Sequence, residues 1–395
     1  MVLTVDYCPL RREREVRAKL IEVGASPQGI ELMVKKAIIY PLEISGLSLP
    51  AANIVKQLAL SKGAEAVLHR DVLIGGAEGK PLLLLATEKQ HKEICQGLRR
   101  NQFSLPELAE KIEETLRVIK CDYWQIAYDG GRLELGKSPL LMGILNITPD
   151  SFFDGGRYLN LHQAVDHVHD LQASGADIID IGGASSRPGH EEVSEREESD
   201  RVLPLIETLA DITIPMSVDT DKPAVARDAL KVGAKIINDI GGLQNRQMLE
   251  LAAESKAPVI VMHQGADKND LMGEIERFFT GVLQRAEQYG IEEEKLIFDP
   301  GLGFGKDTDD NLEIVKNLKH LRVFGRPILL GFSNKRFIGD ILDKPVEDRL
   351  IGTVAVTTWA VAQRVEILRV HNVEAIGQAV RMTEAIMSGR AGLNG

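Results

Sequence analysis

Polar side chains follow a series of short apolar runs in the second part of the chain, and their types suit a charged, planar ligand. In chain order they are Asn146, the 185–188 segment, Asp219, Asn238, His263, Asp299, the 333–335 segment, Arg369 and His371. Carboxylates only accept hydrogen bonds, so Asp219 and Asp299 predict a ligand edge rich in N–H donors. The amide of Asn238 and the ammonium of Lys335 could complete a ring around it. Arg369 offers a fixed fork of donors for a phosphate.

Any one of these positions could simply cap a helix, because Asp, Asn and Ser are common N-cap residues. Capping does not explain the whole set if the strand ends that carry it converge on one small area. The arrangement of strands and helices therefore decides between the two interpretations.

Strand-length apolar runs alternate with helix-period segments from about residue 138 onward. The candidate strands are Leu140–Leu145, Asp177–Ile181, Pro215–Val218, Lys235–Asn238, Pro258–Met262, Leu296–Phe298, Pro327–Gly331 and Glu366–Val370; the candidate helices are 161–174, 195–210, 223–232, 245–255, 273–290, 309–320, 346–363 and 373–388. Continuous apolar strands joined through helices are typical of parallel sheets buried on both faces. Eight such units in about 250 residues predict an α/β fold, a (β/α)8 TIM barrel whose C-terminal strand ends share one face.

Residues 1–137 have a different pattern. Strand-like runs (Met1–Val5, Ala37–Leu42, Val72–Ile74, Leu82–Ala86) mix with helical segments near 11–23, 51–63, 88–100 and 106–120. Cys121–Gly136 reads as a hairpin with its turn at Asp129-Gly130-Gly131. We therefore expect two domains: a small α/β extension, 1–137, without recognisable chemistry, and a catalytic barrel, 138–395.

Composition excludes several classes of protein. Residues 1–137 carry 20 basic and 18 acidic side chains, and the remainder carries 27 basic and 40 acidic ones. Neither part has the basic excess that nucleic-acid binding needs. Three widely spaced cysteines argue against a disulfide framework and a thiolate zinc site. The absence of a signal peptide and of a membrane-length apolar segment predicts a cytoplasmic protein without membrane contact.

Other catalytic motifs are weak or missing. The Gly301–Lys306 segment resembles a phosphate loop, but its spacing is not that of a Walker motif. We interpret its glycines as backbone clearance in a tight turn beside the ligand. The sequence holds no zinc-protease motif and no serine nucleophile elbow.

Taken together, the barrel loops resemble dihydropteroate synthases. Met142 to Asn146 with Asp154-Gly155-Gly156, and Asp180 to Gly183 with Arg187-Pro188-Gly189, are similar to the first two signatures of that family; Ser217 to Thr220, Ile237 to Asp239, Asp299 to Gly301 with Gly303-Phe304-Gly305, Gly331 to Ser333 with Lys335, and Arg369 to His371 follow in its order. The resemblance covers about residues 138–390. It does not extend to residues 1–137.

The resemblance implies condensation of 6-hydroxymethyl-7,8-dihydropterin diphosphate with 4-aminobenzoate, with Mg²⁺ as cofactor and pyrophosphate as leaving group. It implies catalytic roles for Asp219, Asp299, Lys335, Arg369 and His371; substrate contacts from Asn238, Met262, Phe304, Ser333, Asp150, Ser151, Phe152, Asp154, Ser185, Ser186, Arg187 and Pro188; and a metal contact from Asn146. Asp219, Asn238, Asp299 and Lys335 would hold the pterin, with Met262 and Phe304 as apolar walls beside it. Arg369, His371 and Asn146 would hold the diphosphate and its metal. Members of the family are commonly homodimers, for which the apolar face of 346–363 is a candidate.

The chain departs from the family pattern at a few positions. The usual Glu, Thr, Ser, Arg and Asp are replaced by Ala184, Ser186, Phe153, Asn334 and Asn372. None of these changes removes an expected pterin contact, but the missing Arg at position 334 predicts a weaker anion site.

Two other functions remain open at this point. One is a pterin-binding methyltransferase that moves a methyl group from methyltetrahydrofolate to a corrinoid, which would not need Arg369 and His371 for a diphosphate. The other is a catalytically degenerate pterin-binding module, which Asn334 and Asn372 would permit.

Overall fold

The computed structural model describes Cys8, Leu10 and residues 13–70, 80–147, 156–184 and 193–389. It divides the chain into two compact units, Met1–Lys120 and Cys121–Gly395. The sequence placed its boundary later, after residue 137. The difference is the hairpin, whose apolar side chains pack with those of the barrel strands.

The first unit is a small antiparallel sheet with helices. Its strands are β1 (Ile39–Ile44), β2 (Glu65–Val67) and β3 (Leu82–Thr87), in the order β1-β3-β2; its helices are α1 (Glu13–Glu22), α2 (Pro27–Ala37), α3 (Leu49–Ser61), α4 (Glu88–Leu98) and α5 (Leu105–Ile119). The expected helices and two of the expected strands are present, whereas α2 and β2 were not predicted. The expected strands Met1–Val5 and Val72–Ile74 lie outside the described residues.

The second unit contains the predicted barrel. Its parallel strands are β6 (Leu140–Asn146), β7 (Ile178–Gly182), β8 (Met216–Asp219), β9 (Ile236–Asp239), β10 (Val259–Met262), β11 (Leu296–Asp299), β12 (Leu329–Gly331) and β13 (Ile367–Val370), in the order β11-β10-β9-β8-β7-β6-β13-β12. The strands at the two ends of this order are β11 and β12. A parallel bridge between Phe298 and Ile328 connects them and nearly closes the barrel. The Phe298 amide also donates a hydrogen bond to the Pro327 carbonyl at 2.9 Å. All eight strands therefore lie where the sequence predicted them.

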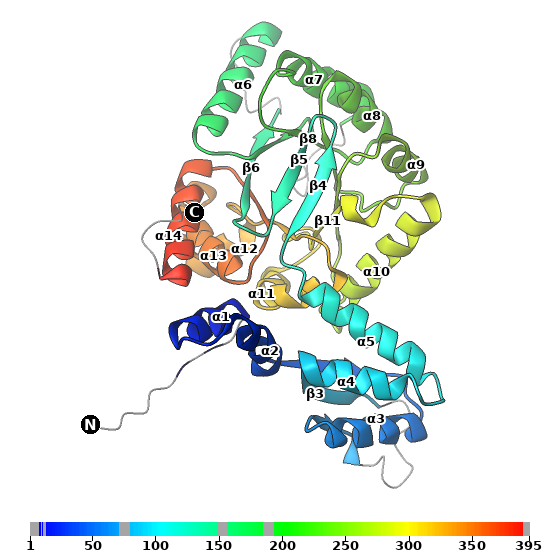
Figure 1. Ribbon diagram of the computed structural model, residues 1–395. Coiled ribbons are helices and arrows are strands. Elements are labelled where there is room, and N and C mark those ends of the chain that lie inside the picture. Colours follow the sequence, from blue (N-terminus) through cyan, green and yellow to red (C-terminus); the bar gives the residue numbers. More distant parts are fainter. Residues whose placement is uncertain are drawn as a thin grey trace, which may run out of the picture. The chain divides into compact units, whose positions relative to one another are not determined.

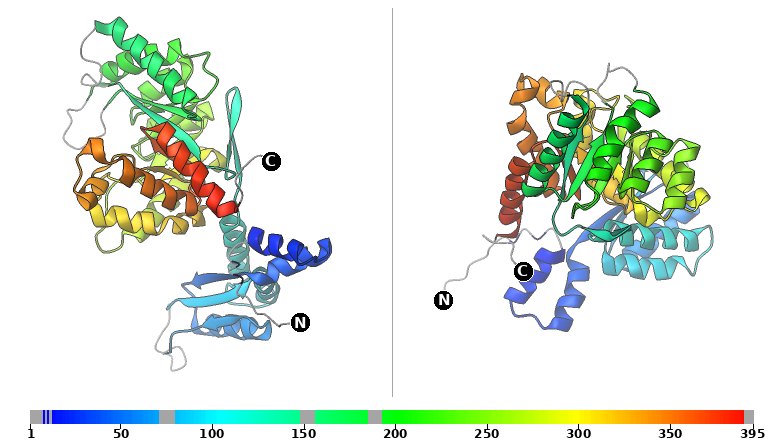
Figure 2. Two further views of the ribbon diagram at one scale, coloured as in Figure 1. Left: turned by 90° about the vertical axis from the view of Figure 1, so that its left-hand side faces the viewer. Right: turned by 90° about the horizontal axis from the view of Figure 1, so that it is seen from above.

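Helices surround these strands (Figures 1 and 2). They are α6 (Gly156–Ala173), α7 (Glu195–Thr208), α8 (Pro223–Val232), α9 (Arg246–Ser255), α10 (Leu271–Tyr289), α11 (Thr308–Lys316), α12 (Arg336–Leu342), α13 (Leu350–Ala362) and α14 (Val373–Ser388). The sequence did not predict α12, which is only two turns long. None of the described helices has the length and apolar character needed to cross a membrane.

The hairpin closes the amino-terminal end of the barrel. Its strands β4 (Trp124–Tyr128) and β5 (Gly131–Leu135) pair in antiparallel register. Ile126, Leu133 and Leu135 are buried in one cluster with inward-facing residues of seven barrel strands, Met142, Ile178, Ile236, Ile260, Ile297, Leu329 and Ile367. Since side chains alternate along a strand, the next inward position in each strand lies two residues later, toward the other end. That end carries the polar residues.

Candidate functional site

The inward positions beyond the apolar layer bring together residues from widely separated parts of the sequence. They include Asp180 from β7, Asp219 from β8, Asn238 from β9, Asp299 from β11 and Arg369 from β13, joined by Lys335 from the loop after β12. We call these six residues the polar belt. The structure therefore gathers the pterin-site residues that the sequence selected and adds Asp180 to them.

Arg369 lies between two carboxylates of the polar belt. Its Nε donates a hydrogen bond to Asp180 Oδ2 at 2.6 Å, and its Nη2 donates one to Asp219 Oδ2 at 2.6 Å. Burial lowers the pKa of Arg369, but the negative charges of Asp180 and Asp219 raise it further, so the guanidinium remains charged. Charge-assisted bonds of this length fix the side chain strongly. The sequence assigned Arg369 to the diphosphate. In the structure Arg369 also connects Asp180 on β7 with Asp219 on β8.

Asp219 is the carboxylate whose protonation is most finely balanced. Burial raises the pKa of Asp219 to about 7, while Arg369 opposes the shift and Asp180 adds to it. Its second oxygen, Oδ1, is buried without a hydrogen-bond partner. Burying an acceptor without a partner costs free energy, and a ligand that brings a donor can remove this cost.

Asp299 and Lys335 form the opposite side of the polar belt. Burial raises the pKa of Asp299, and the Lys335 charge partly offsets it. Burial lowers the pKa of Lys335 to about 8, against the effect of Asp299. The Lys335 ammonium donates a hydrogen bond to the Leu302 carbonyl and lies 4.7 Å from the centre of the Phe304 ring. This contact places the predicted aromatic wall beside the charged groups.

Met262 and His263 end β10. Met262 is buried at an inward position, as expected for an apolar wall. Burial, with the nearby charge of Lys306, lowers the pKa of His263 to about 3, so its ring is neutral. It lies edge-on to Phe278 with 5.0 Å between ring centres. His263 is therefore a packed core histidine.

Ser333 and His371 mark the outer part of the site. The hydroxyl oxygen of Ser333 lies 3.0 Å from His371 Nδ1 and accepts a hydrogen bond from the His371 amide at 3.3 Å. Ser333 is buried, whereas His371 is exposed to solvent. Asn146 stands at the end of β6, where a side chain at Gly182 would meet both its Oδ1 and the Asp219 Cβ. The residues assigned to the diphosphate and its metal are thus arranged around the polar belt.

Several predicted substrate contacts cannot be located. Asp150, Ser151, Phe152, Asp154, Ser185, Ser186, Arg187 and Pro188 lie outside the described residues, as do the departures Phe153 and Ser186. Asn334 is described, with a left-handed backbone (φ 57°). Its amide donates to the Thr353 hydroxyl and its carbonyl accepts from Arg349. Asn tolerates this conformation well, and its backbone is fixed by these contacts.

Sequence reasoning assigned no role to two charged residues at or near the polar belt, Asp180 and Lys306. Asp180 stands inside a strand, so a search limited to strand ends passed over it. Lys306 donates hydrogen bonds to the carbonyls of His263 (3.3 Å) and Phe304 (3.2 Å), and burial lowers the pKa of Lys306 to about 8. It links the loops that follow β10 and β11. Asp180 could have been found from the alternation of inward and outward side chains along β7, because Ile178, Asp180 and Gly182 occupy every second position and face inward.

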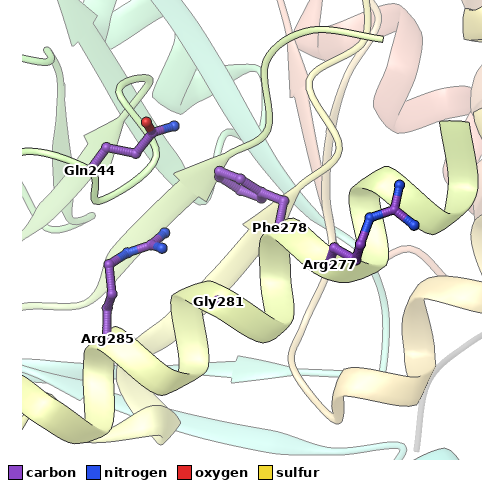
Figure 3. Close-up of a pocket in the computed structure, with 5 residues that line it drawn as sticks. All are labelled: Gln244, Arg277, Phe278, Gly281 and Arg285. Carbon is purple, nitrogen blue, oxygen red and sulfur yellow. The ribbon is translucent and has the colours of Figure 1, made fainter. Parts of the chain in front are cut away.

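A separate depression of about 400 Å³ lies along α10 (Figure 3). It is lined by Gln244, Arg277, Phe278, Gly281 and Arg285. Arg277 is paired with Asp270 at 2.8 Å, and Arg285 donates to the Leu243 carbonyl at 3.1 Å. None of the predicted site residues lines it.

The match to a family model agrees with this geometry. Residues 142–371 match the family described as pterin binding enzymes. The matched range runs from β6 to the residue after β13, and it therefore contains every member of the polar belt.

Individual relatives are named as synthases. The dihydropteroate synthase of Synechocystis is 43% identical over 263 residues, which are 64% of this chain and 91% of that protein. The solved dihydropteroate synthase of Xanthomonas albilineans in complex with 7,8-dihydropteroate is 39% identical, with a TM-score of 0.63; the match covers 67% of this chain and 99% of that one.

A longer match includes the first unit. A Halobacterium salinarum protein, named as a probable bifunctional folylpolyglutamate synthase/dihydropteroate synthase, is 34% identical over 384 residues, 95% of this chain and 46% of that protein. A match of this length includes most of the Met1–Lys120 unit as well as the barrel.

Proposed function

This chain belongs to the pterin binding enzyme family as a dihydropteroate synthase, and we propose that the polar belt is its active site. The enzyme is a transferase that joins 6-hydroxymethyl-7,8-dihydropterin diphosphate to 4-aminobenzoate and releases pyrophosphate. The observation that supports this site best is the arrangement of acidic, amide and basic side chains around Arg369 at one end of a barrel closed by apolar residues at the other. The relatives are synthases, which disfavours the methyltransferase considered from the sequence.

Pterin binding follows from the acceptors of the polar belt. Asp219 has a buried oxygen without a partner, and Asp299 uses Oδ1 to accept from the Gly301 amide at 2.8 Å. Both carboxylates suit the N–H groups along one edge of a pterin. Asn238 would add an amide at the same level, and Met262 with Phe304 would enclose the ring faces. N–H donors from the ligand favour the ionised form of Asp219 over the protonated one.

Cleavage requires charge stabilisation at two places. The bond between the pterin methylene carbon and the diphosphate oxygen breaks with both electrons going to oxygen, which leaves a resonance-stabilised pterin cation. Ionised Asp219 and Asp299 favour that cation electrostatically, and the remaining N–H groups of Arg369 with exposed His371 can stabilise the leaving diphosphate. The amine of 4-aminobenzoate then forms the new C–N bond and loses a proton. No protein nucleophile is needed.

Mg²⁺ is part of the proposal. The ion prefers oxygen ligands and is often held largely by substrate phosphates and water. Asn146 supplies an amide oxygen beside Asp219, and no three His, Cys, Asp or Glu side chains among the described residues are grouped to hold a metal on their own. This donor set fits a metal that arrives with the diphosphate. When bound, the ion would neutralise charge on the leaving group.

The aminobenzoate site is assigned to the loops after β6 and β7. We propose that Asp150 to Asp154 and Ser185 to Pro188 close over this substrate, because both loops start at the mouth that holds the polar belt. Exclusion of water there would protect the pterin cation from hydrolysis.

We propose a homodimer formed through α13 and α14. Ile351 and Trp359 on α13 are 81% and 46% exposed, and Met382 and Ile386 on α14 are 62% and 68% exposed. Large apolar side chains gathered on adjacent helices are typical of a protein interface. Sedimentation velocity should give a mass of two chains for the wild type and a mass of one chain for Ile351→Glu.

A cytoplasmic location is consistent with the free thiols of Cys8, Cys95 and Cys121.

The central test is turnover with the proposed substrates. Protein, pterin diphosphate, 4-aminobenzoate and Mg²⁺ should yield dihydropteroate and pyrophosphate in equal amounts. Asp299→Asn should weaken binding of the pterin about tenfold or more, because an amide turns one acceptor into a donor. Pterin binding without pyrophosphate release would support the degenerate module instead. If Asp299→Asn binds the pterin as tightly as the wild type, Asp299 is not a pterin-binding residue.

A further inference from the structure

Asp180 is the most deeply buried member of the polar belt. Its side chain is fully buried, whereas that of Arg369 is 14% exposed and that of Asp219 is 8% exposed. Its Oδ2 accepts one hydrogen bond from Arg369 Nε at 2.6 Å and another from Asn238 Nδ2 at 3.1 Å. Its Oδ1 has no partner. A ligand that enters from the strand ends therefore meets the neighbours of Asp180 before Asp180 itself.

The contact with Asn238 decides which way that amide points. A carboxamide has an acceptor oxygen and a donor nitrogen of nearly equal size, so either orientation fits the same space. Asp180 Oδ2 accepts from Asn238 Nδ2, and this hydrogen bond selects the orientation of the amide in which Nδ2 faces β7. The Asn238 oxygen and one N–H remain for the ligand in a fixed arrangement.

The contact of Asp180 with Arg369 fixes the orientation of the guanidinium. Asp180 and Asp219 bind the guanidinium through different nitrogens, Nε and Nη2, which sets both its position and the plane of its fork. Without Asp180, Arg369 would keep one carboxylate and could rotate about it. Asp180 thus controls two ligand-facing groups on opposite sides of the site, β9 and β13.

A purely structural role does not account for this residue. Burying a carboxylate with one oxygen unpartnered is costly, and apolar residues of similar size usually stabilise a core at least as well. The neighbouring inward position on the same strand, Ile178, is apolar and belongs to the closed end of the barrel.

We propose that Asp180 is a positioning residue that sets the pattern of donors and acceptors presented to the pterin, and so selects the pterin ring over rings of the same shape with a different pattern. This inference rests on the proposed function. Asp180 acts through Asn238 and Arg369, and the substrate class that it favours carries an amino group on the pyrimidine ring. Lumazines, which carry an oxo group there, are the disfavoured class.

The test compares two rings in two matched variants. Calorimetry would measure binding of 6-hydroxymethylpterin and 6-hydroxymethyllumazine to the full chain, to Asp180→Asn and to Asp177→Asn. Asp177 precedes β7, and its Oδ2 accepts from the Leu141 amide at 2.8 Å, so it offers the same chemical change away from the polar belt. Circular dichroism and thermal melting would confirm that each variant is folded.

The expected result is a change in preference as well as in affinity. Asp180→Asn should bind the pterin about tenfold or more weakly and should lose part of the preference over lumazine, the part that depends on the orientation of Asn238 and Arg369, while Asp177→Asn keeps both affinity and preference. If the affinities for the two rings fall by the same factor, or neither falls, the preference is unchanged. That result would indicate a structural role for Asp180 and overturn the proposal.

A second variant keeps the proposal testable if Asp180→Asn does not fold. Asn238→Ala removes the amide that Asp180 orients, so it must also lower the preference for pterin over lumazine. An unchanged preference in Asn238→Ala would overturn the inference. Failure of the wild-type chain to bind any pterin would instead overturn the proposed function, which separates the two.

Discussion

The two ends of the barrel are built from the same strands and differ in what faces inward. On β7, β9, β11 and β13 an apolar residue is followed, two positions later, by a polar one: Ile178 and Asp180, Ile236 and Asn238, Ile297 and Asp299, Ile367 and Arg369. Two residues of a strand span about 6.6 Å. A complete change from core to binding site therefore occurs over roughly the width of one side chain, and the closed end can stabilise the fold without constraining the ligand.

Each end also contains a largely buried arginine, on β13 at the open end and next to its start at the closed end. At the closed end, Arg322 pairs with Glu366 at 2.9 Å and with Asp122 at 3.0 Å. At the open end, Arg369 pairs with Asp180 and Asp219. Both arginine side chains are 14% exposed. The same chemical pairing thus serves two purposes, and the two arginines allow stability and activity to be separated by mutation.

Arg369→Ala should have the largest effect on activity. It removes the guanidinium that is hydrogen-bonded to both Asp180 and Asp219, and it also removes donors for the diphosphate. We expect turnover to fall by about three orders of magnitude or more, with about 3–5 kcal/mol lost from the free energy of unfolding. Steady-state kinetics and urea unfolding would measure the two effects.

Arg322→Ala is the matched control at the closed end. It should lose a similar amount of stability, about 3 kcal/mol, and retain kcat/KM within about twofold once the protein is folded. A large loss of activity from Arg322→Ala at low temperature would contradict the separation of the two ends.

Leu135→Ala tests the apolar end directly. Leu135 is fully buried in the cluster of the hairpin and the strand starts. Truncation should cost about 3 kcal/mol in the free energy of unfolding, because it leaves a cavity that the closed end cannot fill. Pterin affinity measured by calorimetry should not change. A weaker affinity would mean that the hairpin shapes the polar belt as well.

The pH dependence of pterin binding reports the charged end. Burial raises the pKa of Asp219 to about 7 among Arg369, Asp180, Glu198 and Asp299, so this carboxyl gains a proton as the pH falls below 7 and can no longer accept two N–H donors. Burial lowers the pKa of Lys335 to about 8, so its charge is lost above pH 8. Affinity for a pterin without diphosphate should therefore peak between these values and fall about tenfold per unit further out on either side.

Two further measurements would check this assignment. Asp219→Asn should remove the acidic limb of the binding profile. Stability of the ligand-free protein should change in the opposite sense, since a raised carboxyl pKa favours folding at low pH and this contribution is lost as the pH rises through about 7. An acidic limb that persists in Asp219→Asn would belong to another group.

The sequence predicted the barrel well because its signals are local. Apolar runs, helix periods and polar strand ends located all eight strands, and the positions of Asp299 and Lys335 followed from their places at the end of one strand and in the loop after the next. The pairing of Arg369 with Asp180 was not predictable in that way. It joins residues 189 positions apart through the barrel interior, and it depends on which residues of a strand face inward.

The hairpin illustrates the same limit. Its turn was correctly predicted from Asp129-Gly130, but its packing against the barrel was not, because the apolar positions of Ile126 and Leu133 do not say which surface they cover. Short elements such as α12 also escaped, since seven residues carry too little periodicity to be distinguished from a loop.

Asn372→Asp should have the smallest effect and bears on the open end. Asn372 accepts a hydrogen bond from the Ala375 amide at 3.0 Å and so caps α14, directly after His371. Asp and Asn are nearly equivalent N-caps, and the added negative charge interacts favourably with the helix dipole by about 0.5 kcal/mol. We expect a slightly higher melting temperature and kcat/KM within about twofold of the wild type. A tenfold change in kcat/KM would place residue 372 in the diphosphate site and extend the charged end beyond the polar belt.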